Sequence, residues 1–295
     1  MEDNDVRKGE VFSHLKQWGL VVCDLALFVV LFFLVVGLLG LPLVAAGLDR
    51  APRTVEEGMY LSLLNEGLML VSVVVSAWVV LRLRRLPLSV LGFSTAGRWK
   101  DWLAGLLLAA VLYAVGFGVS LLAGAVEVTG FVGSLPALLL SLSFFLLVAV
   151  CEELMMRGFV LGRMLEGGFN RYVALGLSSL LFSLFHLFNP NFAFLPFLNI
   201  FLAGVLLGAS YLFTRNLCFP IALHWFWNWF QGPVLGYKVS GNDFGESLLS
   251  LRLSDATLLN GGSFGFEGSL LCSVLLVAGI VLVLGYCRKH YGKEE

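Results

Sequence analysis

The chain has 295 residues, of which 59% are hydrophobic and 13% are charged, and its mean hydropathy is +0.90. These values exclude a soluble globular domain and are typical of a polytopic membrane protein. The formal net charge is -1 and the sequence holds no long lysine or arginine tract. We therefore expect a lipid bilayer, and no nucleic acid, among its partners.

Apolar segments of spanning length recur along the whole chain. A helix that crosses a bilayer needs about 20 mainly apolar residues, and this rule predicts eight transmembrane helices. In chain order they cover residues 19–46, 59–81, 102–126, 137–163, 172–188, 194–213, 217–231 and 267–287. The fifth and seventh are short, and the seventh contains Pro220. The predicted fold class is all-α, a polytopic integral membrane helical bundle of about eight transmembrane helices.

Basic residues are unevenly distributed over the connections between these helices. Fourteen of the 19 lysines and arginines lie in the N-terminal tail, the 82–100 connection, the connections after the fourth and sixth helices, and the tail after Tyr286. The opposite side carries four, which are Arg50, Arg53, Lys238 and Arg252. Because cytoplasmic loops are enriched in basic residues, both termini are predicted to be cytoplasmic. In a prokaryote the membrane would be the cell membrane.

Three charged residues, Glu152, Glu153 and Arg157, lie inside the fourth apolar segment. Each charge at the centre of a spanning helix costs ~2.5 to 3.5 kcal/mol, so pairing, water or function must offset it. Residues four apart share one face of a helix, so Glu153 and Arg157 can pair while Glu152 points about 100° away. We therefore expect one supporting ion pair and one free carboxylate.

The same four-residue spacing recurs in two later segments. Phe182 and His186 lie in FSLFH, and His224 and Asn228 lie in HWFWN. Counted at 1.5 Å per residue from the nearest cytoplasmic basic residue, Glu152, His186 and His224 have depths of roughly 16, 22 and 13 Å. These groups occupy one slab in mid-membrane, so a common pocket is geometrically possible. We expect Phe182 to pack near this pocket rather than to take part in chemistry.

These residue types together are able to perform hydrolysis. A glutamate and a histidine within hydrogen-bonding distance can hold a water molecule and take its proton. A second histidine and an asparagine amide can donate hydrogen bonds to the oxyanion that forms when water attacks a peptide carbonyl. No covalent nucleophile is required, so the constellation predicts a hydrolytic site.

Three short motifs resemble those of a known family. EELMMR at 152–157, FSLFH at 182–186 and HWFWN at 224–228 resemble the EExxxR, FxxxH and HxxxN motifs of the CPBP family. This is the CAAX prenyl protease and bacteriocin-processing family of intramembrane proteases, also called the Abi family. Order and spacing both fit, and the resemblance covers about residues 135–232, a third of the chain. Each motif alone is weak evidence for this family, but the three motifs in this order inside predicted membrane spans are a specific signal for it.

The resemblance implies a polytopic, all-helical peptidase and a role for each motif residue. The first glutamate of the pair and the histidine of the second motif, Glu152 and His186, would activate water. His224 and Asn228 of the third motif would form the oxyanion site.

The resemblance also implies that Arg157 orients Glu153. In addition, it divides the chain into three parts. Residues 1–135 would form the N-terminal tail and three variable transmembrane helices. Residues 136–232 would be the catalytic CPBP-like core. Residues 233–295 would supply a loop, the last transmembrane helix and a cytoplasmic tail.

The leading functional hypothesis is an intramembrane endopeptidase that hydrolyses a peptide bond of a membrane-anchored, prenylated or otherwise lipidated protein or peptide. The substrate would be a CAAX protein after lipid attachment in a prenylating cell. In a bacterium it could be a peptide pheromone, a bacteriocin precursor or another membrane protein. Two other classes stay open. One is a proton- or ion-coupled transporter, because intramembrane Glu, His and Arg also form proton relays. The other is a non-proteolytic scaffold or bacteriocin-immunity protein.

A metal site is the alternative to a metal-free mechanism. Two histidines and a glutamate can form a zinc site with an open position, and the ligands would be Glu152, His186 and His224. However, the chain lacks an HExxH motif, the ligands would come from three separate helices, and asparagine is a poor zinc ligand. We therefore favour a glutamate-activated water without a cofactor, with zinc as the other possibility.

Overall fold

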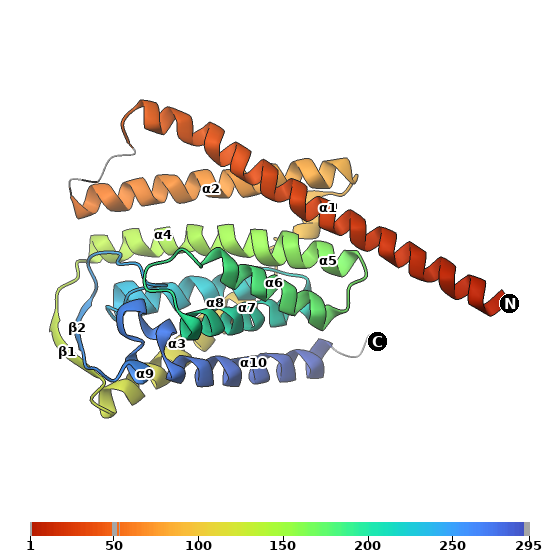
Figure 1. Ribbon diagram of the computed structural model, residues 1–295. Coiled ribbons are helices and arrows are strands. Elements are labelled where there is room, and N and C mark those ends of the chain that lie inside the picture. Colours follow the sequence, from red (N-terminus) through yellow and green to blue (C-terminus); the bar gives the residue numbers. More distant parts are fainter. Residues whose placement is uncertain (1, 49–51, 53, 292–295) are drawn as a thin grey trace.

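The computed structural model describes residues 2–48, 52 and 54–291, and Figure 1 shows their arrangement. The long helices are α1 (Glu2–Ala45), α2 (Val55–Leu83), α3 (Trp99–Leu122), α4 (Leu135–Glu153), α6 (Arg171–Phe185), α7 (Phe194–Thr214), α8 (Cys218–Trp229) and α10 (Leu270–Tyr291). The short elements are η1 (Leu88–Leu91), α5 (Gly162–Glu166), α9 (Thr257–Asn260), η4 (Gly262–Phe264), η5 (Phe266–Gly268), the strands β1 (Val126–Phe131) and β2 (Leu249–Leu253), and the π-helical segments η2 (Leu154–Leu161) and η3 (Phe230–Val234). Arg50, Arg53 and Lys293, which contribute to the predicted topology, lie outside the described residues.

The predicted helical membrane bundle is confirmed. Within the described residues, six helices are long and apolar enough to cross a membrane, namely α1, α2, α3, the continuous α4–η2–α5 rod, α7 and α10. The predicted fifth and seventh segments form α6 and α8, which are shorter. Helix α8 passes directly into the π-helical segment η3, which contains Pro233. The chain is therefore an integral membrane protein with about eight helical passes.

Several predicted boundaries differ from the observed helices, and two of the differences affect the connections around the site. The segment predicted at 102–126 ends at Leu122, because Gly124 adopts a φ of +66° and the chain then enters β1. A residue with positive φ cannot continue a right-handed helix. The segment predicted at 172–188 ends at Phe185, so the histidine of the second motif caps the helix and does not lie within it.

A small antiparallel ribbon, which the sequence did not predict, joins two distant connections. Strands β1 and β2 pair with Val126 opposite Leu253 and Phe131 opposite Leu249, and the register is irregular between Val128 and Gly130. The ribbon ties the connection between α3 and α4 to the long segment that precedes α10. This segment therefore packs against the bundle, although its composition is typical of an extramembrane loop.

The passes are arranged so that the described ends of the chain lie at one end of the bundle (Figure 1). Helices α1 and α2 lie side by side, and α2 contacts α4. Helix α8 contacts α3 and α4, while α7 contacts α6 and α10. The β1–β2 ribbon lies at the end of the bundle away from the N-terminal end of α1 and the C-terminal end of α10. Because the chain crosses the bundle an even number of times, its two described ends lie on the same side.

Close backbone approach between helices depends on glycines four residues apart. A Cβ atom on Gly204 of α7 would lie 2.8 Å from the Cβ of Ser179 on α6, and one on Gly208 would lie 2.4 Å from a Leu175 methyl group. Small residues at this spacing let membrane helices pack closely. The contact brings the α7 backbone near the intramembrane charges described below.

Candidate active site

A cavity of about 1090 Å³ lies among α2, α4, α7, α8 and the C-terminal end of α6. Four sequence-predicted site residues line it: Glu152, His186, His224 and Asn228. They come from three separate parts of the chain, the end of α4, the cap of α6 and the middle of α8. The structure thus brings together the residues that the three motifs singled out, and their chemical roles stay predictions.

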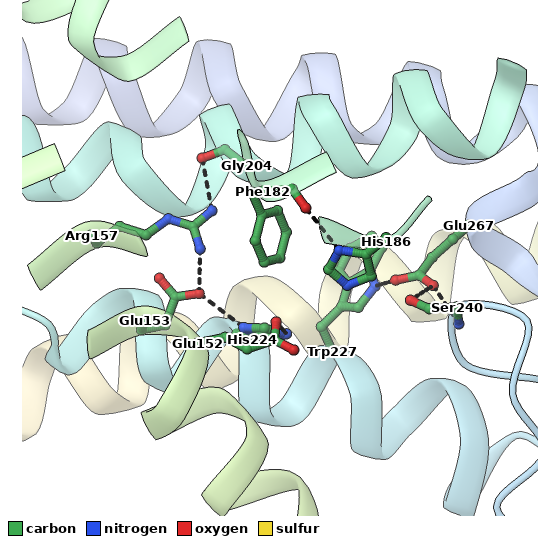
Figure 2. A network of polar contacts seen from close by, with 10 residues as sticks. All are labelled: Glu152, Glu153, Arg157, Phe182, His186, Gly204, His224, Trp227, Ser240 and Glu267. Atoms are coloured by element: carbon green, nitrogen blue, oxygen red, sulfur yellow. Dashed lines mark hydrogen bonds and ion pairs between the residues drawn. The ribbon is translucent and has the colours of Figure 1, made fainter. Parts of the chain in front are cut away.

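The predicted ion pair between Glu153 and Arg157 is confirmed. Nη1 of Arg157 lies 2.7 Å from Oε1 of Glu153, and the two side chains are 1% and 0% exposed. Nη2 of the same guanidinium donates to the carbonyl oxygen of Gly204 on α7 at 3.1 Å. The pair therefore places two buried charges in contact and also links the α4–η2 rod to α7, as Figure 2 shows.

Phe182 packs between the charged and the imidazole groups. The guanidinium carbon of Arg157 lies 4.5 Å from the centroid of the Phe182 ring, a cation–π geometry. The same ring contacts His186 and His224 at centroid distances of 4.9 and 6.1 Å. Phe182 is thus in a packing position next to the cavity, as its predicted role requires.

His224 lies between the two glutamates of the first motif. Its Nδ1 is 2.9 Å from Oε1 of Glu153, and its Nε2 is 3.7 Å from Oε2 of Glu152. An ionised carboxylate only accepts hydrogen bonds, so Nδ1 of His224 is the donor in the first contact. The contact fixes the ring orientation and turns Nε2 toward the cavity. The sequence did not predict this bond, because 71 residues separate its two partners.

Glu152 is the more accessible of the two carboxylates. Its side chain is 26% exposed, compared with 0% for Glu153, and it faces the cavity. Its Oε2 atom is buried and has no hydrogen-bond partner among the described residues. Glu66 of α2 lines the same cavity and interacts electrostatically with Glu152. The free carboxylate expected from helical spacing is therefore the one that a substrate could reach.

His186 caps α6, and its own helix fixes its ring. Nδ1 of His186 lies 2.8 Å from the carbonyl oxygen of Phe182. Because a carbonyl oxygen can only accept, Nδ1 carries the proton and a neutral ring keeps Nε2 as an acceptor. This tautomer is the one that a base holding a water molecule needs. Asn228 lies four residues after His224 on α8 and is buried at the cavity wall.

A further buried carboxylate, Glu267, was not among the predicted site residues. The last span was predicted to begin at Glu267, but Glu267 lies in η5, before α10 begins at Leu270. It lines the cavity and accepts hydrogen bonds from Trp227 Nε1 at 3.1 Å and from the backbone and hydroxyl of Ser240, both at 2.8 Å. Gln231 Nε2 is a fourth donor at 3.3 Å. The signal for Glu267 in the sequence was that it is a lone acidic residue at the edge of an apolar segment.

Replacing Glu267 by alanine is expected to loosen this wall of the cavity. The change removes the acceptor for Trp227 and Ser240 and leaves buried donors unpaired, which should lower the free energy of unfolding by about 2 to 3 kcal/mol. Thermal unfolding in detergent, followed by tryptophan fluorescence, measures the effect. Glu246→Ala is the matched control, because Glu246 is exposed in the same connection. Equal stability of both variants would contradict a bracing role.

The choice between a zinc site and a metal-free mechanism stays a prediction. Among the residues that the structure describes, no three His, Cys, Asp or Glu side chains are grouped so that they could hold a metal ion. The alternative ligands Glu152, His186 and His224 all line the cavity, and a zinc site there stays the other possibility.

The central part of the chain matches a known protein family. Residues 133–230 match the family model described as type II CAAX prenyl endopeptidase Rce1-like. The matched region contains all three motifs, and it confirms the resemblance to the CAAX prenyl protease family. No curated protein and no solved structure shows significant similarity to this chain.

Proposed function

We propose that this chain hydrolyses a peptide bond of a membrane-anchored or lipidated polypeptide inside the membrane. The premise is that residues 133–230 match the Rce1-like type II CAAX prenyl endopeptidase family, so that the chain is a peptidase. One observation carries the proposal. Glu152, His186, His224 and Asn228 line a single cavity among the helices. A water molecule and a peptide carbonyl could reach all four groups from this space.

In the proposed mechanism, Glu152 and His186 hold the attacking water. The Glu152 carboxylate takes a proton from the water, and Nε2 of His186 accepts a second hydrogen bond that orients the oxygen. The water oxygen attacks the carbonyl carbon and forms a tetrahedral oxyanion. Glu152 then gives its proton to the leaving nitrogen as the carbon–nitrogen bond breaks.

The oxyanion would be stabilised from the α8 side of the cavity. Protonated His224 donates from Nε2, and the Asn228 amide supplies a second donor. Glu153 holds His224 by its Nδ1 at 2.9 Å and so turns Nε2 toward the cavity. Arg157 keeps Glu153 in place through a contact of 2.7 Å, so this buried pair acts on the reaction through His224 and is not catalytic itself.

The proposal includes the topology of the chain. Both termini would be cytoplasmic, because the connections at their end of the bundle carry most of the basic residues. The substrate would be a polypeptide held at the membrane by a lipid group or a spanning segment, since the reacting groups lie among membrane-spanning helices.

Peptide cleavage by purified protein tests the proposed function. Protein in detergent is incubated with a library of lipid-linked peptides, and the products are identified by mass spectrometry. We expect defined cleavage products, and we expect the activity to survive exhaustive chelation. Loss on chelation with rescue by zinc would contradict the metal-free mechanism. A folded protein that cleaves no peptide but drives Glu152-dependent uptake into proteoliposomes would favour a transporter instead.

A further inference from the structure

The cavity is confined to one part of the bundle and reaches the surface at one end. Its lining includes exposed residues of the connections around Pro52 and Thr54 and around Asp243 and Gly245. The N-terminal end of α2, which Thr54 caps, and the connection that precedes β2 lie at the end of the bundle where Figure 1 shows the β1–β2 ribbon. The mouth of the cavity is therefore at this end.

None of the described residues at the end of the bundle that holds the termini lines the cavity. Three connections lie at this end, at 84–98, 167–170 and 215–217, and none of their residues lines it. The lining residues of α2 come from its N-terminal half, between Gly58 and Met69. The reacting groups are thus accessible from one side of the membrane, and this side is opposite the termini.

Charge identifies the two sides. Ten basic residues of the described chain lie at helix ends or connections on the side of the termini, and they are Arg82, Arg84, Arg85, Arg98, Lys100, Arg163, Arg171, Arg215, Arg288 and Lys289. The described connections at the mouth end carry two, Lys238 and Arg252, and Arg252 is paired with Glu127 at 3.0 Å. Basic residues concentrate on the cytoplasmic side of membrane proteins, so the mouth lies on the other side.

Charged contacts anchor the end that holds the termini. Asp24 of α1 binds Arg84 at 2.7 Å and Arg163 at 2.9 Å, which ties α1 to the ends of α2 and α5. The hydrogen bond that Arg84 donates to Asp24 raises the pKa of Arg84, so this guanidinium stays charged at any physiological pH. Because acidic residues contribute little to the positive-inside rule, these paired arginines still count toward the cytoplasmic assignment of this end.

We infer that the catalytic cavity opens on the non-cytoplasmic face of the membrane, and that the substrate is an exported polypeptide anchored in the membrane with its scissile bond presented from that face. The inference rests on the proposed peptidase function and narrows its substrate class. A protein that is prenylated and retained in the cytoplasm would approach from the closed end. An exported lipoprotein or a secreted peptide precursor approaches from the open end.

The mouth has the features of an entrance for such a chain. The Val239–Asn242 bridge forms a turn beside it, and Ser240 in this turn is held by Glu267. Phe244 packs against Phe144 and Phe145 of α4, with ring centroids 5.4 and 5.0 Å away. An anchored peptide would pass this aromatic edge before it reaches Glu152.

Labelling of single introduced cysteines tests the side on which the mouth lies. Glu246→Cys places a thiol in the exposed connection at the mouth end, and Thr95→Cys places one in the exposed connection at the other end. With a membrane-impermeant maleimide, we expect Glu246→Cys to label in intact cells and Thr95→Cys to label only after permeabilisation. The unsubstituted chain corrects for its own five cysteines. The reverse pattern would overturn the inference.

Sided cleavage then separates this inference from the proposed function. The protein is reconstituted in liposomes sorted by the orientation of the Glu246→Cys label, and a lipid-linked peptide is added to the outer leaflet only. We expect at least tenfold faster cleavage when the mouth faces outward, and equal rates for both preparations in detergent. No cleavage in detergent would overturn the peptidase function itself. Cleavage in detergent with the opposite sidedness would overturn only the inference.

Discussion

Replacing Glu152 by glutamine should reduce peptide cleavage by about 10² to 10⁴-fold, the usual contribution of a positioned general base. The amide has almost the same shape as the carboxylate but cannot take a proton from water. Because Glu152 is partly exposed at the cavity and has no strong ion-pair partner, the variant should fold normally. Initial rates on a lipid-linked peptide, measured alongside thermal unfolding, check both expectations.

Glu246→Gln is the matched control for this experiment, because it makes the same chemical change at an exposed residue that does not line the cavity. We expect wild-type rates from the control. Cleavage at the wild-type rate by a folded Glu152→Gln protein would remove Glu152 from the mechanism. The same experiment distinguishes a peptidase from a scaffold or an immunity protein, because a non-proteolytic protein would cleave the peptide neither as the wild type nor as the variant.

Replacing Arg157 by methionine should have the largest effect on stability. The change leaves the Glu153 carboxylate buried without its cation, and breaking a buried ion pair in this way costs about 3 to 5 kcal/mol. The donor to the Gly204 carbonyl is lost as well. Unfolding in a detergent series, followed by tryptophan fluorescence, gives the difference in unfolding free energy between the variant and the wild type.

Two further variants make this prediction specific. The double change Glu153→Gln with Arg157→Met removes both charges and should recover much of the lost stability, but cleavage should stay low because His224 loses its carboxylate partner. Arg252→Met breaks a surface pair whose side chains are 71% and 62% exposed, so it should change stability by about 1 kcal/mol or less. If Arg157→Met were no more destabilising than Arg252→Met, the buried pair would not support the fold.

Local periodicity was sufficient to predict the parts of the site that lie within one helix. The pairing of Glu153 with Arg157 was predicted from a separation of four residues on a helix, and the pair forms although Arg157 lies in the π-helical segment η2. The same geometry predicts that Glu152 points away from this ion pair and stays outside it. The helical membrane bundle follows from composition and from the recurrence of apolar segments, because lipid requires each spanning backbone to satisfy its own hydrogen bonds.

Contacts between distant segments could not be predicted in this way. The bond between His224 and Glu153, the donation from Arg157 to Gly204 and the donors around Glu267 join residues that are 27 to 71 positions apart. They depend on how closely and at what angle the helices pack, which a one-dimensional pattern does not encode.

The sequence by itself determined that this chain spans a membrane, that three motifs resembling those of a peptidase family lie within its apolar segments, and which connections carry the basic residues. These properties are set by hydrophobicity, helical periodicity and charge, which act locally. Only the tertiary structure decided that Glu153 holds His224, that Glu267 braces the cavity wall, and that the cavity opens at the end opposite the termini. The reason is physical, because a cavity is bounded by side chains from many helices and exists only once these helices have packed.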